Sequence, residues 1–176
     1  MRQSKMSYAG IGSRVTPGNI LVTMQQIGKA LALEGWTLRS GNCTGADQAF
    51  AKGANSVNPK LVELYLPWRS YEAGSVAIGN VVYMPSCEAY RIAAKYHPAW
   101  HKCSKAAQAM HARNVQIILG ARLNKPVQQV ICWTPGAKAI GVTALGIRIA
   151  QAWGIEVRNL AKECVVVEQK QTEFAW

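Results

Sequence analysis

A glycine-rich segment near the start of the chain carries residue types that could bind an anion. In YAGIGSRVTP (8–17), Gly10 and Gly12 let the backbone turn tightly and approach a ligand, and Ser13 and Arg14 follow immediately. A hydroxyl can donate one hydrogen bond to a phosphate, and a guanidinium can donate two in parallel. A helix that begins just beyond the loop would add free N–H groups and a partial positive charge. The alternative is a purely structural turn, since Val15 stands where the dinucleotide-binding fingerprint has its third glycine.

A second segment, SGNCTGAD (40–47), repeats this arrangement of glycines around small polar residues. Asp47 is the only aspartate in the chain. Its carboxylate either caps the helix that follows or accepts hydrogen bonds from ribose hydroxyls or a base. The candidate ligand-binding residues of this segment are Ser40, Gly41, Asn42, Thr44, Gly45 and Asp47.

Two later segments complete the set of candidate ligand-binding positions. Arg113 and Asn114 interrupt an otherwise apolar helical pattern, which indicates a role in reading phosphate or a base rather than a surface role. The segments WTPG (133–136) and GVT (141–143) lie between a predicted strand and a predicted helix, and they are typical of a backbone nest for an anion. The candidates here are Thr134, Gly141 and Thr143.

The charge distribution favours an anionic partner. The chain has 20 Lys and Arg against 9 Asp and Glu, a net charge of +11, and residues 89–155 contain no acidic residue at all. An ordinary solvated surface mixes both signs, so nucleic acid, a nucleotide or another phosphorylated molecule is the expected partner, with an idle basic surface as the alternative.

Cysteine and histidine usage predicts neither a disulfide framework nor a metal site. Five cysteines are scattered without CxxC spacing, which is typical of reduced thiols in the cytoplasm. His97, His101 and His111 lie near one another, but no carboxylates at ligand spacing accompany them. No apolar run is long enough for a membrane span and the first residues lack a signal-peptide core, so we expect a cytoplasmic protein without a metal or cofactor.

Alternating strand and helix patterns must position these loops. Strands are predicted near 6–11, 36–40, 61–67, 81–85, 128–135 and 155–160. Helices are predicted over about 17–33, with Thr16 as N-cap, then 46–54 ending on Gly53, 86–97, 104–120 and 143–153. The predicted fold is α/β: a Rossmann-like three-layer sandwich with a mostly parallel central sheet, in one domain over 1–176. In such sheets ligands bind at the carboxyl ends of the strands, where the loops 10–16, 40–46, 67–70 and 134–143 lie.

With these elements in order, the sequence resembles the SLOG superfamily of Rossmann-like nucleotide-binding proteins. The likeness is closer to the DNA-processing protein A (DprA/Smf) family than to the LOG-type phosphoribohydrolases. It is carried by YAGIGSR, by LRSGNCTGADQAFAKGA, by HARNVQIILG and by GVTALGIRIAQAWG, and it spans residues 8–160. The resemblance implies a Rossmann-like sheet with a phosphate pocket, and the residues that would line it are Gly12, Ser13, Arg14, Ser40, Gly41, Gly45, Asp47, Arg113 and Asn114. Asn42 replaces a family glycine, Val115 replaces the second arginine of R-N-R, and the catalytic PGGxGTxxE of the phosphoribohydrolases is absent.

Three functions follow as expectations. The first is capture of a free nucleotide or nucleotide-derived signal molecule, which in a bacterium infected by a phage would act against host defence. The second is DprA-like binding of single-stranded DNA, for which Tyr90, Tyr96 and Trp100 among basic residues could stack on bases. The third is hydrolysis of a nucleotide N-glycoside, with Asp47 and Glu88 as the only candidate catalytic groups. We also expect a homo-oligomer, as is common in the superfamily.

Overall fold

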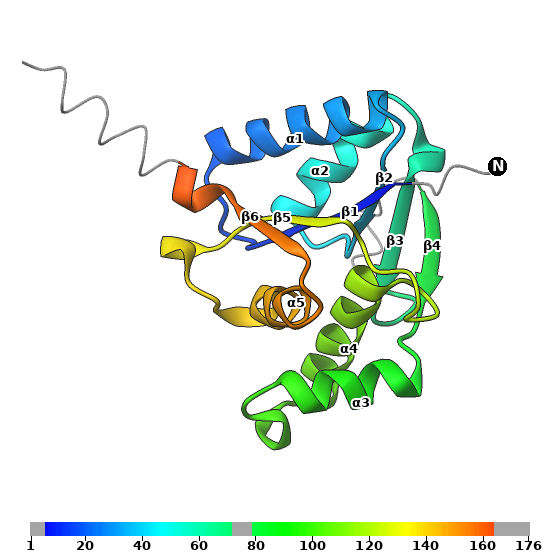
Figure 1. Ribbon diagram of the computed structural model, residues 1–176, viewed down its shortest axis with the longest axis vertical. Coiled ribbons are helices and arrows are strands. Elements are labelled where there is room, and N and C mark those ends of the chain that lie inside the picture. Colours follow the sequence, from blue (N-terminus) through cyan, green and yellow to red (C-terminus); the bar gives the residue numbers. More distant parts are fainter. Residues whose placement is uncertain (1–5, 72–78, 164–176) are drawn as a thin grey trace, which may run out of the picture.

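A parallel β-sheet forms the middle of the molecule (Figure 1). The computed structural model describes residues 6–71 and 79–163. The sheet order is β4-β3-β2-β1-β5-β6, and every neighbouring pair is parallel. Each predicted strand is present, and the strands are β1 (Ser7–Gly12), β2 (Thr37–Ser40), β3 (Val62–Leu66), β4 (Asn80–Tyr83), β5 (Gln129–Trp133) and β6 (Glu156–Asn159).

Helices cover both faces of the sheet, so the predicted three-layer α/β fold is confirmed (Figure 1). One face packs against α1 (Gly18–Leu33) and α2 (Ala46–Asn55). The other packs against α3 (Cys87–Tyr96), α4 (Lys105–Leu119) and α5 (Gly141–Ala152). Short 3₁₀ helices occur at η1 (Pro59–Leu61), η2 (Trp100–Lys102) and η3 (Pro135–Ala137). Within the described ranges, no helix is both long and apolar enough to cross a membrane.

Alternation along the strands divides the core into two clusters. Tyr8 and Leu38 point to the α1–α2 side, whereas Ala9 and Ile11 point to the side of α3, α4 and α5. Successive side chains of a strand point to opposite faces, so strands buried on both faces are largely apolar, and the polar side chains of β2 need internal partners such as those of Arg39. Burial on both faces explains the continuous apolar runs of the sequence.

The helix α2 begins at Ala46 as predicted, whereas the expected N-cap of α1, one of the two roles considered for Asp47 and the end of α2 differ from the structure. Thr16 does not cap α1: Pro17 is its N-cap, and the Thr16 hydroxyl instead donates a 2.6 Å hydrogen bond to the Ser13 carbonyl. Asp47 does not cap α2 either, because Gly45 is the N-cap and Asp47 lies within the first turn. The helix also continues through Gly53 to Asn55. Local sequence preferences identify a helix end only to within a few residues, and tertiary contacts decide the rest.

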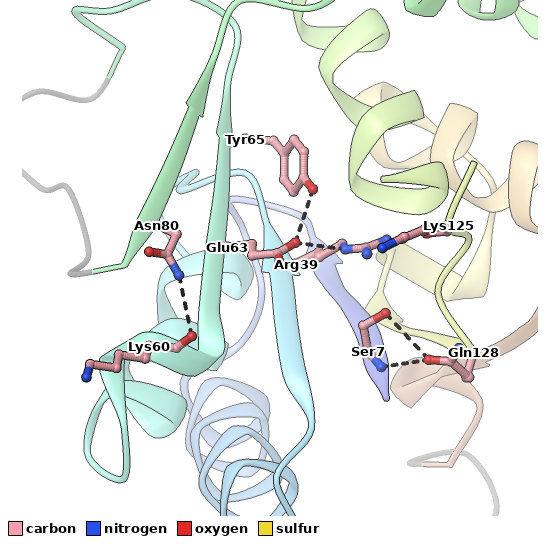
Figure 2. A network of polar contacts seen from close by, with 8 residues as sticks. All are labelled: Ser7, Arg39, Lys60, Glu63, Tyr65, Asn80, Lys125 and Gln128. Atoms are coloured by element: carbon pink, nitrogen blue, oxygen red, sulfur yellow. Dashed lines mark hydrogen bonds and ion pairs between the residues drawn. The ribbon is translucent and has the colours of Figure 1, made fainter. Parts of the chain in front are cut away.

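A polar network fixes the connection between α4 and β5 to the sheet (Figure 2). The Arg39 guanidinium forms a 3.0 Å ion pair with Glu63 and donates to the carbonyl of Lys125 at 2.6 Å. The Tyr65 hydroxyl donates to the same Glu63 carboxylate at 3.1 Å. At the neighbouring strand start, the Ser7 N–H donates to the side chain of Gln128 at 2.6 Å. The returning chain is thereby held where β5 must enter beside β1.

Candidate functional site

A cavity of about 500 Å³ lies at the carboxyl ends of β1 and β5. The strands β2, β3 and β4 follow one another outward from one edge of β1, whereas β5 and β6 lie beyond its other edge. The strand order therefore reverses between β1 and β5. A reversal of this kind leaves a crevice in which α/β proteins bind ligands. The cavity is lined by Gly12, Ser13, Arg14, Val15, Cys43, Met110, Thr134, Pro135, Ile140, Gly141, Val142 and Thr143.

The structure brings one part of the predicted site together at this cavity. The predicted residues that line it are Gly12, Ser13, Arg14, Thr134, Gly141 and Thr143. The remaining predicted residues are outside the lining and are Gly10, Ser40, Gly41, Asn42, Thr44, Gly45, Asp47, Arg113 and Asn114. Several of these support the residues that do line the cavity.

Backbone amides of the loop after β1 already donate to acceptors of the protein itself. The Ser13 N–H donates to the Trp133 carbonyl at 3.2 Å, and the Val15 N–H donates to the Ser13 hydroxyl oxygen at 3.2 Å. The Thr16 N–H donates to the Ser13 carbonyl at 3.4 Å, and α1 begins only at Gly18. What this loop offers the cavity is therefore its side chains. They are the Ser13 hydroxyl, which can still donate a hydrogen bond, and the Arg14 guanidinium, which also donates a 3.0 Å hydrogen bond to the Tyr71 hydroxyl.

The start of α5 supplies the backbone donors that the first loop lacks. Gly141, Val142 and Thr143 are its first residues and all line the cavity, and Ile140 as N-cap provides no side-chain cap. The first N–H groups of a helix have no partner within the helix and carry the positive end of its dipole. Asn114 holds this helix start in place by donating to the Val142 carbonyl at 2.9 Å. The helix start that lines the cavity is thus that of α5 rather than that of α1.

Arg113 and Asp47 form a buried clamp around the loop after β2. The Arg113 guanidinium donates to the carbonyls of Gly41 and Tyr65, while the Asp47 carboxylate accepts from the N–H groups of Gly41 and Cys43 at 3.2 Å each. Burial raises the pKa of the Asp47 carboxyl, and the charge of Arg113 opposes that rise. Both side chains are almost fully buried. Arg113 and Asp47 thereby fix the conformation of the loop after β2, which contributes Cys43 to the lining of the cavity.

Two glycines of this loop are required by close packing. A Cβ atom on Gly41 would overlap the Arg113 guanidinium. A Cβ atom on Gly45 would lie 2.9 Å from the Ser13 carbonyl oxygen, and the φ of Gly45 is +94°. Both positions therefore require glycine because of space, and Gly45 also because of its backbone conformation.

Cys43 and Tyr71 are site residues that were missed at the sequence level. The Cys43 thiol lines the cavity and lies 2.9 Å from the Tyr71 hydroxyl. Burial, followed by the charge of Asp47, raises the pKa of Cys43, so the thiol is protonated at neutral pH and is not activated as a nucleophile. Burial and the hydrogen bond with Cys43 raise the pKa of Tyr71 to about 12. The only signal for Tyr71 was the loop that follows the third predicted strand.

Apolar side chains make up much of the remaining lining. Val15 is 72% exposed and Ile140 is 48% exposed, although both are hydrophobic. Met110, Pro135 and Val142 join them around the cavity. A cavity with a polar end and an apolar wall suits a ligand that carries both an anionic group and a flat or apolar group.

The two candidate catalytic carboxylates lie elsewhere. Asp47 is engaged in the buried clamp, and Glu88 is exposed on α3 in a 3.0 Å ion pair with Arg91. Among the residues described, no Asp or Glu lines the cavity. The arrangement supplies hydrogen-bond donors and positive charge, which are the properties of a binding site.

Comparison with solved structures confirms the Rossmann-like fold shared with DprA. DNA-processing protein A from Helicobacter pylori matches with a TM-score of 0.59 and 16% identity over 88% of this chain and 64% of that chain. DprA from Streptococcus pneumoniae matches with a TM-score of 0.58 and 18% identity over 88% of this chain and 50% of that chain. The Moco carrier protein of Chlamydomonas reinhardtii matches with a TM-score of 0.52 and 18% identity over 89% of this chain and 76% of that chain.

These likenesses concern the fold. The matched part of the first DprA is 64% of its length, so the chain spans less than two thirds of that protein. No protein-family model and no curated protein matches the sequence.

Proposed function

We propose that the chain binds a free nucleotide or a nucleotide-derived signal molecule in the cavity between β1 and β5. The observation that carries this proposal is the composition of the cavity wall. Arg14, Ser13 and the start of α5 can hold a phosphate, and the apolar side chains beside them can cover a base. In a phage-infected bacterium, such a protein would act by sequestering the signal.

A second candidate is binding of single-stranded DNA, which two observations favour. The fold is shared with DprA of Helicobacter pylori, which binds single-stranded DNA. Exposed basic residues also follow one another on the side of α3 and the start of α4, and they are Arg91, Lys95, Lys102 and Lys105. A polymer could follow such a surface, whereas a free nucleotide needs only the cavity.

The cavity is tested by changing the charge at its rim. Val15 lines the cavity and is highly exposed, so replacing it leaves the core intact. We expect Val15→Glu to weaken binding of a nucleoside phosphate at least about tenfold by repelling the anion, whereas Val15→Lys preserves binding or strengthens it. Isothermal titration calorimetry over a panel of nucleotides and cyclic nucleotides measures both effects.

The matched control is Val22→Glu, at a 57% exposed valine on α1 that does not line the cavity. Equal affinities for Val15→Glu and Val22→Glu, or no nucleotide in the panel bound by the unaltered chain, would overturn the proposal. Chromatography of the nucleotide after incubation separates the alternatives further. Binding without catalysis leaves the nucleotide intact, whereas release of its base would support a hydrolase instead.

A further inference from the structure

Three potential metal ligands converge between α3 and α4, away from the cavity. His97 is the C-cap of α3, Cys103 follows η2, and His111 lies within α4. One ligand atom from each of the three residues lies within 4.8 Å of the other two. The two imidazole rings are 4.4 Å apart between centroids, and the Cys103 sulfur is 3.8 Å from the Nδ1 atom of His97. None of the three residues lines the cavity.

His111 carries an unpaired polar atom at this position. The residue is 5% exposed, and its Nδ1 atom is buried and lacks a hydrogen-bond partner within the described part of the chain. Burying a polar atom without a partner costs free energy, so such atoms in native proteins usually mark a bound ion, a water or a functional role. Trp100 packs beside both imidazoles, at 6.1 Å from His97 and 6.4 Å from His111 between ring centroids.

We propose that His97, Cys103 and His111 bind a zinc ion. Two imidazole nitrogens and one thiolate form a donor set that zinc favours, and a water would complete the tetrahedron. In a tetrahedral zinc site the nitrogens lie about 3.3 Å apart and each nitrogen about 3.6 Å from the sulfur. The observed spacing of up to 4.8 Å requires only a modest contraction around the ion.

The protons of the three ligands can be accounted for. The Nδ1 atom of His97 accepts a 3.2 Å hydrogen bond from the Ala99 N–H, so the ring proton is on Nε2 and the Nδ1 lone pair is the one that could coordinate a metal, although the Ala99 N–H now engages it. Zinc would replace this hydrogen bond with a coordinate bond. The Cys103 thiol loses its proton to solvent on binding, and no oxidant or reductant takes part.

The surrounding charge makes Cys103 the decisive ligand. Arg148 on α5 and Arg113 on α4 act electrostatically on His111, and both would repel a cation. Residues 89–155 contain no acidic residue that could compensate. Glu88 at the start of α3 is paired with Arg91, so the Cys103 thiolate is the only negative charge within the ligand set, and replacing it should cost more affinity than its geometry alone suggests.

The test uses the full chain without a histidine tag, after treatment with a chelator. Adding one equivalent of Co²⁺ should give a thiolate-to-cobalt charge-transfer band and tetrahedral d–d bands. One equivalent of Zn²⁺ should raise the unfolding temperature and displace the cobalt. Cys103→Ser should abolish the charge-transfer band and weaken zinc binding at least about tenfold, and His97→Gln should weaken it to a similar degree.

Two control variants preserve the cluster. Cys87→Ser removes an exposed thiol at the start of α3, and His101→Gln removes the exposed histidine of η2, so both should bind zinc as the unaltered chain does. A wild-type chain without the charge-transfer band, or a Cys103→Ser variant with unchanged zinc affinity, would overturn the proposal. If Cys103→Ser fails to fold, two other measurements decide the question. They are the cobalt spectrum of the wild type and the zinc affinity of His97→Gln, a change at a half-buried residue.

Discussion

At the scale of single residues, the backbone of Gly41 is held between the side chains of Arg113 and Asp47. Arg113 donates to its carbonyl, and Asp47 accepts from its N–H. The sequence predicted Arg113 as a group that faces a ligand, and Asp47 either as a helix cap or as a group that faces a ligand. Every residue from 111 to 119 of α4 is buried, so Arg113 lies in a helical segment covered on all sides, and apolar residues at 110, 117 and 118 flank Arg113 in the sequence. These flanking apolar residues could have indicated a buried role from the sequence.

At this scale we predict that Gly41→Ala destabilises the protein by at least about 2 kcal/mol. The added methyl group overlaps the Arg113 guanidinium. Arg113 is almost fully buried, so its side chain cannot move away from the methyl group freely. Urea denaturation followed by circular dichroism measures the free energy of unfolding. Gly18→Ala is the matched control, because a Cβ atom there meets nothing within 4 Å, and its effect should stay within about 0.5 kcal/mol. Equal effects of the two changes would contradict the clamp.

At the scale of elements, the sequence predicted every described strand and the helices α1 to α5, most to within two residues. Near-continuous apolar strands and apolar residues at helical spacing explain this success. A strand buried on both faces and a helix buried on one face leave different apolar patterns, so the type of element can be predicted from the sequence. The hydrogen bonds of the loops were not predicted. The sequence offered two helix starts as anion sites, the one after the first loop and the one at GVT (141–143). In the structure, N–H groups of the first loop already donate to protein acceptors, whereas Gly141–Thr143 form the open start of α5. Hydrogen bonds between segments far apart in the chain leave no local pattern.

The network of Figure 2 leads to a prediction about the connection between α4 and β5. Glu63→Gln removes the charge that faces the Arg39 guanidinium, whose side chain is only 10% exposed. We expect a loss of about 2 kcal/mol in the free energy of unfolding, because this hydrogen bond involves two charged groups and is largely shielded from water. Ligand affinity should not change, since no member of the network lines the cavity.

The control for this change is Glu163→Gln, which removes an exposed ion pair with Arg158 and should cost less than about 1 kcal/mol. Thermal and chemical denaturation of both variants provide the comparison. A Glu63→Gln variant as stable as Glu163→Gln would show that Arg39 is held by its carbonyl contact alone.

At the scale of the whole molecule, the net charge of +11 makes binding of either proposed partner depend on salt concentration, and the strength of that dependence distinguishes DNA from a nucleotide. A strand of DNA bound along the exposed residues Arg91, Lys95, Lys102 and Lys105 would contact several phosphates. With four contacts, the logarithm of its binding constant would fall with the logarithm of salt concentration at a slope of about −3. A nucleotide confined to the cavity engages one or two charges, so its slope should be near −1.

We expect the shallow slope for a mononucleotide, measured by fluorescence anisotropy between low and moderate salt. The double change Lys102→Gln and Lys105→Gln should leave nucleotide binding unaltered. For an oligonucleotide, the same change should reduce the slope by about 1.4 if DNA follows this surface. Lys29→Gln with Lys52→Gln, on the helices of the opposite face, is the matched control. A steep slope for the oligonucleotide that only the first pair reduces would favour the DNA-binding alternative.

Four of the five residues 110–114 of α4 each contact a different part of the molecule. Met110 lines the cavity, His111 belongs to the histidine–cysteine cluster, Arg113 clamps the loop after β2, and Asn114 holds the start of α5. Successive residues of an α-helix are rotated by about 100°, so deleting one residue before this segment would turn all four side chains away from their partners at once. Evolution can therefore vary these contacts by substitution, but changes in chain length must be confined to the connections outside α4.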